Sequence, residues 1–490
     1  MGKALSKRPP VRKTASSKAS GLSRKRPATS AKAVVRSGKS AATQAVRTFK
    51  SALNFINSHT NFEKMLRVGY NQNNFNLSRM SRLLADLGNP HKKFRTVHVA
   101  GTKGKGSTCT MIAAMLQNTG FKTGLYTSPH FIDIRERICI NGAQISEAEF
   151  TRLMAHMAPI VKRHQKENPT FFEIMTAASF YHFAHHKVEW AVVETGLGGR
   201  LDSTNVIEPD AVGIVSISYD HMAQLGRTLE AIAEEKAGIF KPGVPVISAP
   251  QPPGVRKVLR DKAAKVGCDL RILCEDLEFS YRFESSRESG PHTRVCMATV
   301  NTRFDHLQVP LLGEHQAFNC GVALGVIDAL RRNGVTINEQ RAIDGLSKVK
   351  LQGRLEVIRE NPRVVVDAAH NASSIAACMR AIGQNISYDS MVVIFGCSAD
   401  KDIDGMLEQI QIGADKVIFT NNCSPRSADP YELQQRFIEK TQKMAQVEPN
   451  LLDAYRTAGH CVGRDDLICI TGSVYLVGAA KQKLVGKNIL

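Results

Sequence analysis

The sequence predicts an α/β protein built around a largely parallel sheet, on two observations. Short runs rich in β-branched and aliphatic residues recur along the chain, and helical patterns lie between them. Several of these runs are continuously apolar, as expected when helices cover both faces of a parallel sheet. The predicted strands are residues 96–100, 188–194, 212–217, 364–367, 391–395, 416–420 and 466–471.

The chain is long enough for two or three domains at 490 residues. The segment SKVKLQGRLEV has the character of a connector, and the strand–helix pattern restarts after it. We therefore predict a large first domain over residues 50–345, a connector over 346–355 and a smaller α/β domain over 356–490. Residues 275–305 are polar and predict an exposed hairpin.

The net charge of +20 is concentrated at the N-terminus. Residues 1–50 contain 14 Lys and Arg and no acidic residue, so the rest of the chain carries 20 − 14, or +6. We predict that residues 1–49 form a disordered basic extension. Three roles remain open for it: a solvated tail, an organelle transit peptide or a nucleic-acid-binding arm. Because no aromatic residue precedes Phe49, base stacking is not expected, and we predict no specific nucleic-acid partner.

Composition favours a cytoplasmic protein without a membrane partner. Hydrophobic residues make up 43% and charged residues 22% of the chain, as in ordinary globular proteins. No apolar run approaches the roughly 18–20 residues needed to cross a bilayer. Eleven cysteines without a CxxC pair indicate a reducing compartment. A mitochondrial or plastid location is the alternative if the basic extension is a transit peptide.

Residues 100–110, AGTKGKGSTCT, predict a phosphate-binding loop between a strand and a helix. Glycines at 101, 104 and 106 allow several backbone N–H groups to face one anion, and Lys105 adds a cation at a helix N-terminus. The match to GxxxxGK[ST] is imperfect, since only three residues separate Gly101 from Lys105.

Three residues near predicted strand ends are candidate magnesium ligands, since a nucleoside triphosphate requires the metal. Glu194 ends one strand, His221 follows another, and Ser128 lies in YTSPH. Parallel sheets bind ligands at the carboxyl ends of their strands. Each residue also has a structural reading: a cap for Glu194, a loop histidine for His221 and a turn former for Ser128.

Lys236 in EEKAGIFKPG permits two readings. On a helix flanked by carboxylates it is expected to be a solvated lysine. The alternative is an active-site lysine carbamylated by CO2, which would supply a carboxylate to a metal.

Together these motifs resemble the folylpolyglutamate synthase and dihydrofolate synthase family of the Mur ligase superfamily. The resemblance extends from residue 74 to residue 478 in family order. Its motifs are NFNLSRM (74–80), GTKGKGSTC (101–109), TSPHFIDIRERICINGAQIS (127–146), TFFE (170–173), ETGLGGRLDSTN (194–205), DHMAQLG (220–226), EEKAGIFKPGVP (234–245), GEHQAFN (313–319), GRLE (353–356), DAAHN (367–371), SADKD (398–402) and TGSVYLVG (471–478).

The resemblance implies a P-loop-type, ATP-binding Mur ligase central domain and a smaller Rossmann-like C-terminal ligase domain. It implies a monomeric ligase that uses ATP and Mg2+ to join L-glutamate to a folate carboxylate through an acyl phosphate. The acceptor would be a reduced folate, and TFFE and NFNL favour dihydropteroate as a second acceptor.

The resemblance also assigns residue roles. It implies catalytic roles for Lys105, His221 and Lys236, the last carbamylated, and magnesium binding by Ser128, Glu194 and His221. It implies ATP binding by Gly101, Thr102, Lys103, Gly104, Lys105, Gly106, Ser107, Asn319, Arg354 and Asp367. It implies substrate binding by Asn74, Phe75, Asn76, Leu77, Thr170, Phe171, Phe172, Glu173, Leu201, Asp202 and Ser203, with His370 and Ser373 on the glutamate side.

The chain departs from the family pattern at Lys103, where many relatives have Asn, and at Ala372, where many have Pro. Two other functions remain open: a cell-wall Mur-type amino-acid ligase and a nucleic-acid-binding P-loop ATPase. The first should lack NFNL, TFFE and GLGGRLDSTN as a set, and the second should show ATP turnover stimulated by nucleic acid.

Overall fold

The computed structural model describes residues 46–65, 71, 74–286, 290–299 and 302–486. The predicted basic extension, residues 1–49, lies outside the described residues except for its last four. The first helix, α1 (Phe49–Asn57), begins where the basic composition ends.

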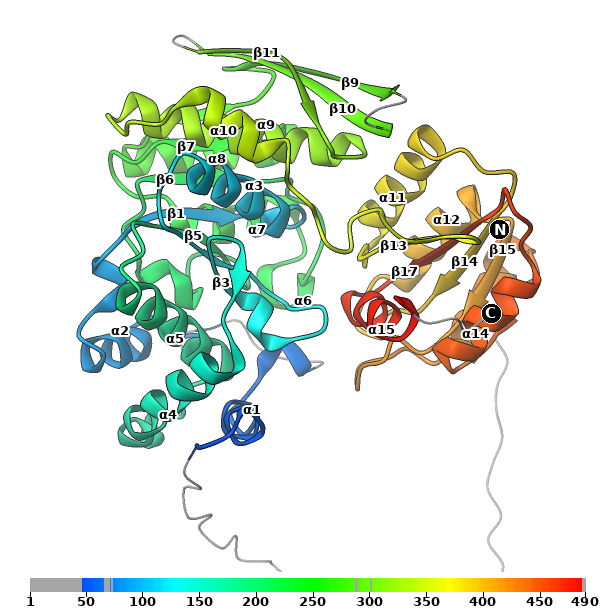
Figure 1. Cartoon of the computed structure of the whole chain (residues 1–490), viewed down its shortest axis with the longest axis horizontal. Helices are drawn as coiled ribbons and strands as arrows, with labels where there is room; N and C mark the ends of the chain where they lie inside the picture. The colour runs from blue at the N-terminus through cyan, green and yellow to red at the C-terminus, as the bar shows by residue number, and fades with distance from the viewer. Residues whose placement is uncertain (1–45, 66–70, 72–73, 287–289, 300–301, 487–490) are drawn as a thin grey trace, which may run out of the picture. The chain divides into compact units, whose positions relative to one another are not determined.

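An eight-stranded sheet organises the N-terminal half of the chain, residues 46–346 (Figure 1). Its strand order is β4-β3-β2-β5-β1-β6-β7-β8. All neighbouring pairs from β2 to β8 are parallel, and β3 and β4 add an antiparallel edge. The strands are β1 (Arg95–Ala100), β2 (Thr123–Tyr126), β3 (Ile138–Ile140), β4 (Ala143–Gln144), β5 (Trp190–Glu194), β6 (Ala211–Ile214), β7 (Val246–Ser248) and β8 (Leu270–Ile272).

Helices cover both faces of this sheet because its strands are apolar on both sides. In β5, Val192 packs with α3, α9 and α10, whereas its neighbour Val193 packs with α4 and α5 on the other face. Helices α7 and α8 pack against β6, β7 and β8. The helices are α2 (Leu77–Asp86), α3 (Lys105–Asn118), α4 (Glu147–Arg163), α5 (Phe171–His185), α6 (Met222–Leu225), α7 (Leu229–Lys236), α8 (Pro253–Val266), α9 (Glu314–Arg332) and α10 (Glu339–Leu346).

Side-chain caps fix several helix starts. Ser146 and Glu149 form a capping box at α4, and Thr170 and Glu173 form another at α5. Short 3-10 helices connect the longer elements: η1 (Phe62–Lys64), η2 (Pro90–Lys92), η3 (Ile134–Arg137), η4 (Gln165–Glu167), η5 (Ser203–Val206) and η6 (Ala237–Ile239).

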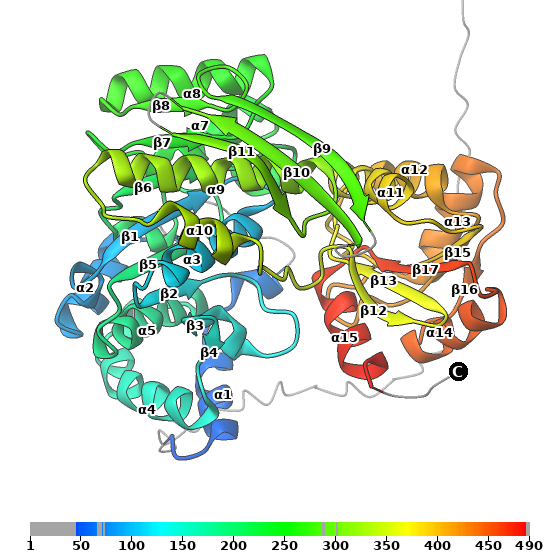
Figure 2. The same ribbon diagram turned by 45° about the horizontal axis from the view of Figure 1, so that its top comes forward.

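A three-stranded antiparallel sheet lies over α9 (Figure 2). It comprises β9 (Glu278–Ser286), β10 (Gly290–Ala298) and β11 (Arg303–Val309). The predicted hairpin is confirmed as the β9–β10 pair, but β11 adds a third strand. The hairpin is exposed only in part, because Val295 and Met297 are buried in the cluster that contains α9.

A six-stranded sheet organises the C-terminal half, residues 356–486. Its order is β12-β13-β17-β14-β15-β16, and all pairs are parallel except β12–β13. Helices α11, α12 and α13 pack in a cluster on one face, and α14 and α15 in a cluster on the other. The elements are β12 (Glu356–Glu360), β13 (Arg363–Asp367), α11 (Ala372–Asn385), β14 (Met391–Phe395), α12 (Ile403–Gly413), β15 (Lys416–Phe419), α13 (Pro430–Thr441), β16 (Gln446–Val447), α14 (Leu451–His460), β17 (Leu467–Thr471) and α15 (Val474–Leu484).

The predicted fold class is confirmed, and each of the seven predicted strands has a counterpart, with ends that differ by at most three residues. Residues 347–355, between α10 and β12, form no helix or strand, at the place of the predicted connector. The domain boundaries themselves stay a prediction.

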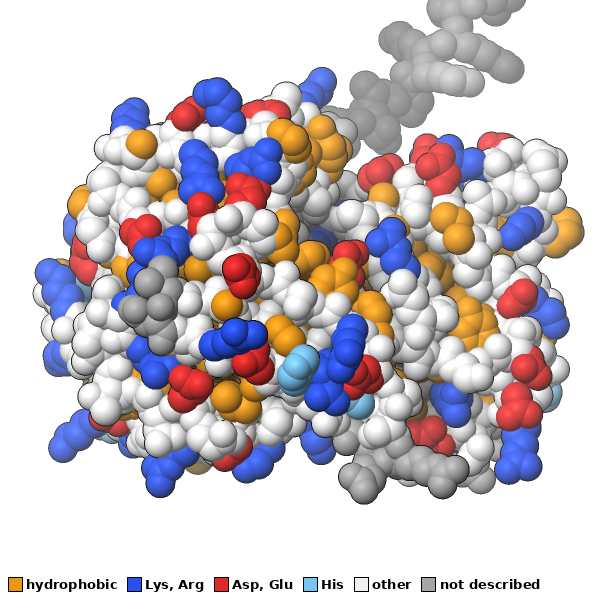
Figure 3. Space-filling model, turned by 90° about the horizontal axis from the view of Figure 1, so that it is seen from above, with side chains coloured by type: hydrophobic (Ala, Val, Ile, Leu, Met, Phe, Trp, Pro, Cys, Tyr) orange, Lys and Arg blue, Asp and Glu red, His pale blue; other side chains and the backbone are white. Residues whose placement is uncertain are grey.

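The described surface mixes both signs of charge on the face shown in Figure 3, where Lys and Arg side chains are interspersed with Asp and Glu. Among the described helices, none combines the length and the apolar character that crossing a membrane requires.

A buried ion pair joins α2 to α5. The Arg79 guanidinium lies 2.8 Å from the Glu173 carboxylate, and both side chains are almost fully buried. Arg79 also donates to the carbonyl oxygen of Asn74 at 3.0 Å, which ties the pair to the segment before α2.

Arg79→Leu is expected to lower the free energy of unfolding by about 3 kcal/mol, because it leaves Glu173 charged and buried without its partner. Urea unfolding followed by fluorescence measures this change, since the single tryptophan, Trp190, lies in β5 of the same sheet. Arg82→Leu is the control: Arg82 is 53% exposed in its pair with Glu167, so the loss should stay below about 1 kcal/mol. Equal losses in the two variants would contradict a special role for the buried pair.

Candidate active site

The phosphate loop, residues 101–104, joins β1 to α3 and depends on two glycines. Gly101 has φ +148°, and a Cβ atom there would lie 2.2 Å from Val215 Cγ2. Gly104 has φ +94°, and a Cβ atom would lie 2.1 Å from Asn319 Oδ1. Gly104 is the N-cap of α3 and provides no side chain to cap it. The first N–H groups of this 14-residue helix therefore present an anion-binding end.

A cavity of about 250 Å3 lies beside this loop, and we call it the main cavity. Its walls include Lys105, Ser128, Glu194, His221 and Lys236, all of which the sequence predicts as site residues. The parallel register accounts for this convergence, because β2, β5, β1 and β6 end at one edge of the sheet.

Glu194 and Lys105 form the charged centre of this wall. Glu194 Oε1 lies 3.8 Å from Lys105 Nζ, and Glu194 Oε2 accepts a hydrogen bond of 3.0 Å from the Ser128 backbone N–H. Burial raises the pKa of the Glu194 carboxyl, and Lys105 opposes this shift. A cation beyond Lys105 would stabilise the buried carboxylate further.

The donors on this wall fit a magnesium ion. Mg2+ prefers oxygen ligands and keeps several waters, so it needs few protein groups. Glu194 supplies a carboxylate, Ser128 a hydroxyl and His221 an imidazole around the same cavity. The described residues contain no cluster of three or more His, Cys, Asp or Glu able to hold a metal alone. These three residues would therefore hold magnesium together with phosphate oxygens.

Lys236 is buried at the last position of α7, so of its two readings the solvated lysine is excluded. Its ammonium donates a hydrogen bond of 2.7 Å to the carbonyl oxygen of Gly101. Burial, reinforced by Lys105, lowers the pKa of Lys236 to about 7. A large fraction of this amine is therefore neutral near neutral pH, which is the form that reacts with CO2.

The Lys103 side chain has partners other than those of Lys105. Its ammonium lies 2.8 Å from Asp220 Oδ2 and contacts the His370 ring. Burial alone would raise the pKa of Asp220, but Lys103 and Lys401 hold it well below its usual range. The backbone of Lys103 stays in the phosphate loop, whereas its charge is engaged with Asp220.

The other predicted ATP-binding residues divide into three groups. Arg354 lines the main cavity. Asn319 lines a second cavity of about 180 Å3, which shares Lys103 and Gly104 with the first. Ser107 and Asp367 line neither cavity; the Asp367 carboxylate accepts hydrogen bonds from the N–H groups of Leu355 and Ala369.

Most predicted substrate residues border the main cavity: Asn74, Phe75, Thr170, Phe172, Glu173, Asp202, Ser203 and His370. The structure does not bring Asn76, Leu77, Phe171, Leu201 or Ser373 to its wall. Asn76 caps α2 through the Arg79 N–H, Phe171 and Leu201 are buried, and Ser373 donates to Asn371 at the start of α11.

The C-terminal half contributes charged residues that the sequence did not single out: Asp400, Lys401 and Arg426. Arg426 Nη1 lies 3.4 Å from Asp400 Oδ2. The motif SADKD contains Asp400 and Lys401, so the sequence pointed to their segment without giving either residue a role.

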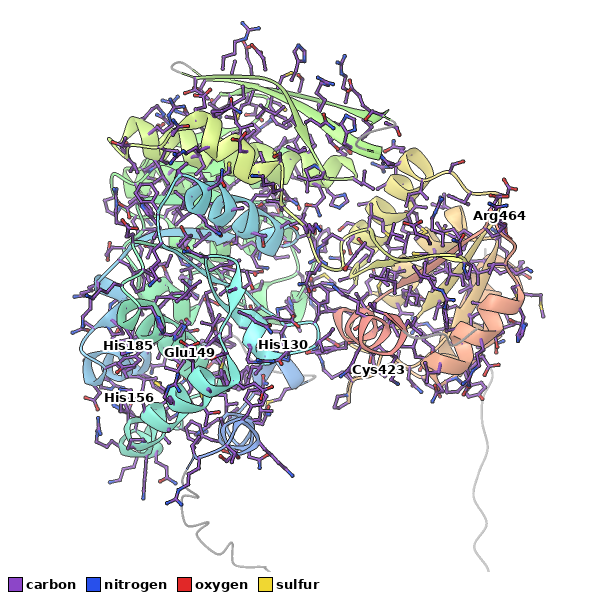
Figure 4. The ribbon with its side chains drawn as sticks, in the orientation of Figure 1. His130, Glu149, His156, His185, Cys423 and Arg464 are labelled. Atoms are coloured by element: carbon purple, nitrogen blue, oxygen red, sulfur yellow. The ribbon has the colours of Figure 1, made fainter. Side chains whose placement is uncertain are left out.

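Glu63 and Arg137 form a second feature that sequence reasoning missed. The Arg137 guanidinium binds both Glu63 oxygens, at 2.8 and 2.7 Å, and Glu63 lines the main cavity. Arg137 Nε also donates to Nδ1 of His130, labelled in Figure 4, at 2.9 Å. Burial and Arg137 lower the pKa of His130 to about 4, so this ring is a neutral acceptor. Because Glu63 and Arg137 are 74 positions apart, no local pattern signals the pair.

Comparison with known proteins gives a consistent result. Residues 99–327 match the Mur ligase middle domain, and residues 353–474 match the Mur ligase glutamate ligase domain. The chain is 35% identical over 413 residues to a dihydrofolate synthase/folylpolyglutamate synthase of Bacillus subtilis, which covers 83% of this chain and 94% of that protein.

Two solved structures share the whole architecture. Mycobacterium tuberculosis folylpolyglutamate synthase complexed with ADP has a TM-score of 0.82 at 30% identity, covering 91% of this chain and all of that one. Escherichia coli FolC in complex with DHPP and ADP has a TM-score of 0.78 at 26% identity. The match covers 90% of this chain and 98% of that one. The chain therefore belongs to the folylpolyglutamate synthase and dihydrofolate synthase family of the Mur ligases and is an ATP-dependent ligase.

Proposed function

We propose that this ligase joins L-glutamate to the carboxylate of a reduced folate and of dihydropteroate, through an acyl phosphate. One observation carries the proposal: a phosphate loop, a buried carboxylate and a buried lysine meet in one cavity that cationic residues also line. The loop contributes Lys105, the carboxylate is Glu194, the lysine is Lys236, and the cationic residues are Arg354, Lys401 and Arg426.

The first step activates a poor acylating agent. A carboxylate oxygen of the acceptor attacks the γ-phosphorus of ATP, the bond to the β-phosphate oxygen breaks, and ADP leaves. Lys105 and the N-terminal N–H groups of α3 stabilise charge on the phosphoryl oxygens. When bound at Ser128, Glu194 and His221, Mg2+ would neutralise phosphate charge as well.

The second step forms the amide. The amine of glutamate attacks the acyl carbon as the free base, inorganic phosphate leaves with the C–O bond electrons, and the proton lost by the amine passes to the leaving phosphate. Lys401 and Arg426 carry charges that match the two carboxylates of glutamate, and His370 lies beside Lys401's partner Asp220. Enclosure by both halves of the chain keeps water from the acyl phosphate.

Lys236 supports the first step if it is carbamylated. A neutral ε-amine adds to CO2 and loses a proton, which gives an N-carboxylate. Its pKa near 7 makes the neutral form available, and its position beside Gly101 would place the new carboxylate next to the phosphate loop. Such a carboxylate could bind a second cation or orient Lys105.

Two relatives favour activity on both acceptors. The Bacillus subtilis relative bears the names of both synthases, and the Escherichia coli structure contains DHPP. A cell-wall Mur ligase fits less well, because NFNL, TFFE and GLGGRLDSTN occur together in this chain. We propose further that the enzyme acts as a monomer in the cytoplasm, with an organelle as the alternative.

Phosphate release from ATP and magnesium with glutamate tests the function, with dihydropteroate and tetrahydrofolate supplied separately. We expect release with each acceptor. Release with tetrahydrofolate alone would restrict the enzyme to polyglutamate synthesis. Release with neither, from protein that still binds ATP, would contradict the proposed substrates.

Lys105→Ala is expected to lower kcat by about 100- to 1,000-fold, because it removes the fixed positive charge that stabilises the phosphoryl group during its transfer. Circular dichroism should show an unchanged fold. Lys122→Ala, which lies outside the main cavity, should keep its activity. Near-normal turnover by the Lys105 variant would refute the phosphate role.

Lys236→Ala is expected to lose about 10- to 100-fold in kcat and to recover part of it with added acetate or propionate, which replace the lost carboxylate. Lys241→Ala is a matched control, since Lys241 lies outside the main cavity and its Nζ donates to the Asn205 carbonyl oxygen at 3.4 Å. It should lose little activity and gain nothing from acetate. A Lys236 variant that carboxylic acids never rescue would argue against the carbamate.

A further inference from the structure

Three charged side chains from distant parts of the chain meet at the main cavity. Lys103 Nζ lies 2.8 Å from Asp220 Oδ2, and Lys401 Nζ lies 2.6 Å from Asp220 Oδ1. Lys103 belongs to the phosphate loop, Asp220 follows β6, and Lys401 lies between β14 and α12 of the C-terminal half. One carboxylate therefore binds an ammonium from each half of the chain, through different oxygens.

The triad is shielded from water. The exposed fractions of the side chains are 7% for Asp220, 10% for Lys401 and 20% for Lys103. Ion pairs in such surroundings are stronger than exposed ones, and removal of one partner is costly because the other charge stays buried. The side chains of Lys103, Asp220 and Lys401 should therefore be held more rigidly than those of a surface ion pair.

Other hydrogen bonds reinforce the same junction. On one side, the Thr102 N–H donates to the Ser216 carbonyl oxygen at 2.8 Å, which ties the phosphate loop to the segment that carries Asp220. On the other side, Asn371 Nδ2 donates to the Tyr219 carbonyl oxygen at 3.3 Å. The segment 216–221 thus contacts both the phosphate loop and the start of α11.

Lys103 in the phosphate loop and Lys105 at the start of α3 have separate partners. Lys105 faces Glu194, on the wall where we place the phosphates, whereas Lys103 faces Asp220. Of the two ammonium groups, only that of Lys105 therefore lies beside the carboxylate on the phosphate wall, whereas that of Lys103 lies beside Lys401 of the C-terminal half.

We propose that Lys103 is a positioning residue that couples the phosphate loop to the C-terminal half through Asp220 and Lys401. It holds Lys401 and His370 in place at the cavity wall, so it acts on the amino-acid side of the reaction rather than on ATP. The kinetic part of this proposal rests on the proposed function, since it assumes that glutamate binds beside Lys401.

Lys103→Met is expected to raise the KM for glutamate at least fivefold and to lower kcat. The dissociation constant of a non-hydrolysable ATP analogue with magnesium, measured by calorimetry, should change less than threefold. Lys103→Arg should recover part of the loss, because the guanidinium retains the charge. Lys257→Met is the control, since Lys257 is 77% exposed and pairs with Asp261, one helical turn away.

Amide hydrogen exchange supplies a test that needs no turnover. In Lys103→Met without ligands, exchange should rise in residues 398–402, which are distant in sequence from the substitution, and should stay unchanged in Lys257→Met. If Lys103→Met folds poorly, Lys103→Gln replaces it, since the amide keeps polarity without charge.

Two results would overturn the proposal. One is a loss of analogue affinity above tenfold with glutamate KM and exchange unchanged, which would make Lys103 a phosphate ligand. The other is unchanged exchange at residues 398–402 in both Lys103→Met and Lys103→Gln. The exchange experiment tests the coupling role of Lys103 even if the wild-type enzyme proves inactive on folates. Failure of this proposal is therefore distinguishable from failure of the proposed function.

Discussion

Parallel pairing of the central strands is the constraint on which the site depends. The register places Val99 of β1 opposite Glu194 of β5 and opposite Gly213 of β6. The segments that follow these strands must then leave the sheet at one edge. A shift of one residue in β5 would turn the Glu194 carboxylate to the opposite face of the sheet and away from Lys105. The helices on both faces hold this register by burying alternate side chains of each strand.

This arrangement concentrates charge that would be costly to bury without partners. Lys105 is near Glu194, Lys103 and Lys401 share Asp220, and Arg137 binds Glu63. Lys103, Lys105 and Lys401 therefore face a common cavity while each retains a neighbouring carboxylate. Such a site is prepared for substrates that bring negative charge, as a nucleoside triphosphate and a dicarboxylic amino acid do.

Sequence reasoning succeeded where the signal is local. Apolar runs gave the strands, and the glycine-rich loop lies between a strand and a helix as expected. From its neighbours alone, sequence reasoning favoured a solvated Lys236 and needed the family resemblance to place it in the site, because the burial of α7's last residue depends on packing with the rest of the fold. It also gave no role to Lys401 and missed the pair of Glu63 with Arg137, since each lies beside its partner only after the chain has folded. The direction of a charged side chain such as Lys103 likewise depends on tertiary contacts.

Phosphorylation of the acceptor carboxylate by ATP in the main cavity is the step on which the proposed function depends. The most direct measurement uses an acceptor whose reacting carboxylate carries 18O, with mass analysis of the phosphate released. Attack of that carboxylate on the γ-phosphorus, followed by expulsion of phosphate, transfers one labelled oxygen per turnover to inorganic phosphate. Unlabelled phosphate accompanying amide formation would contradict the acyl phosphate and the roles assigned to Lys105 and Glu194.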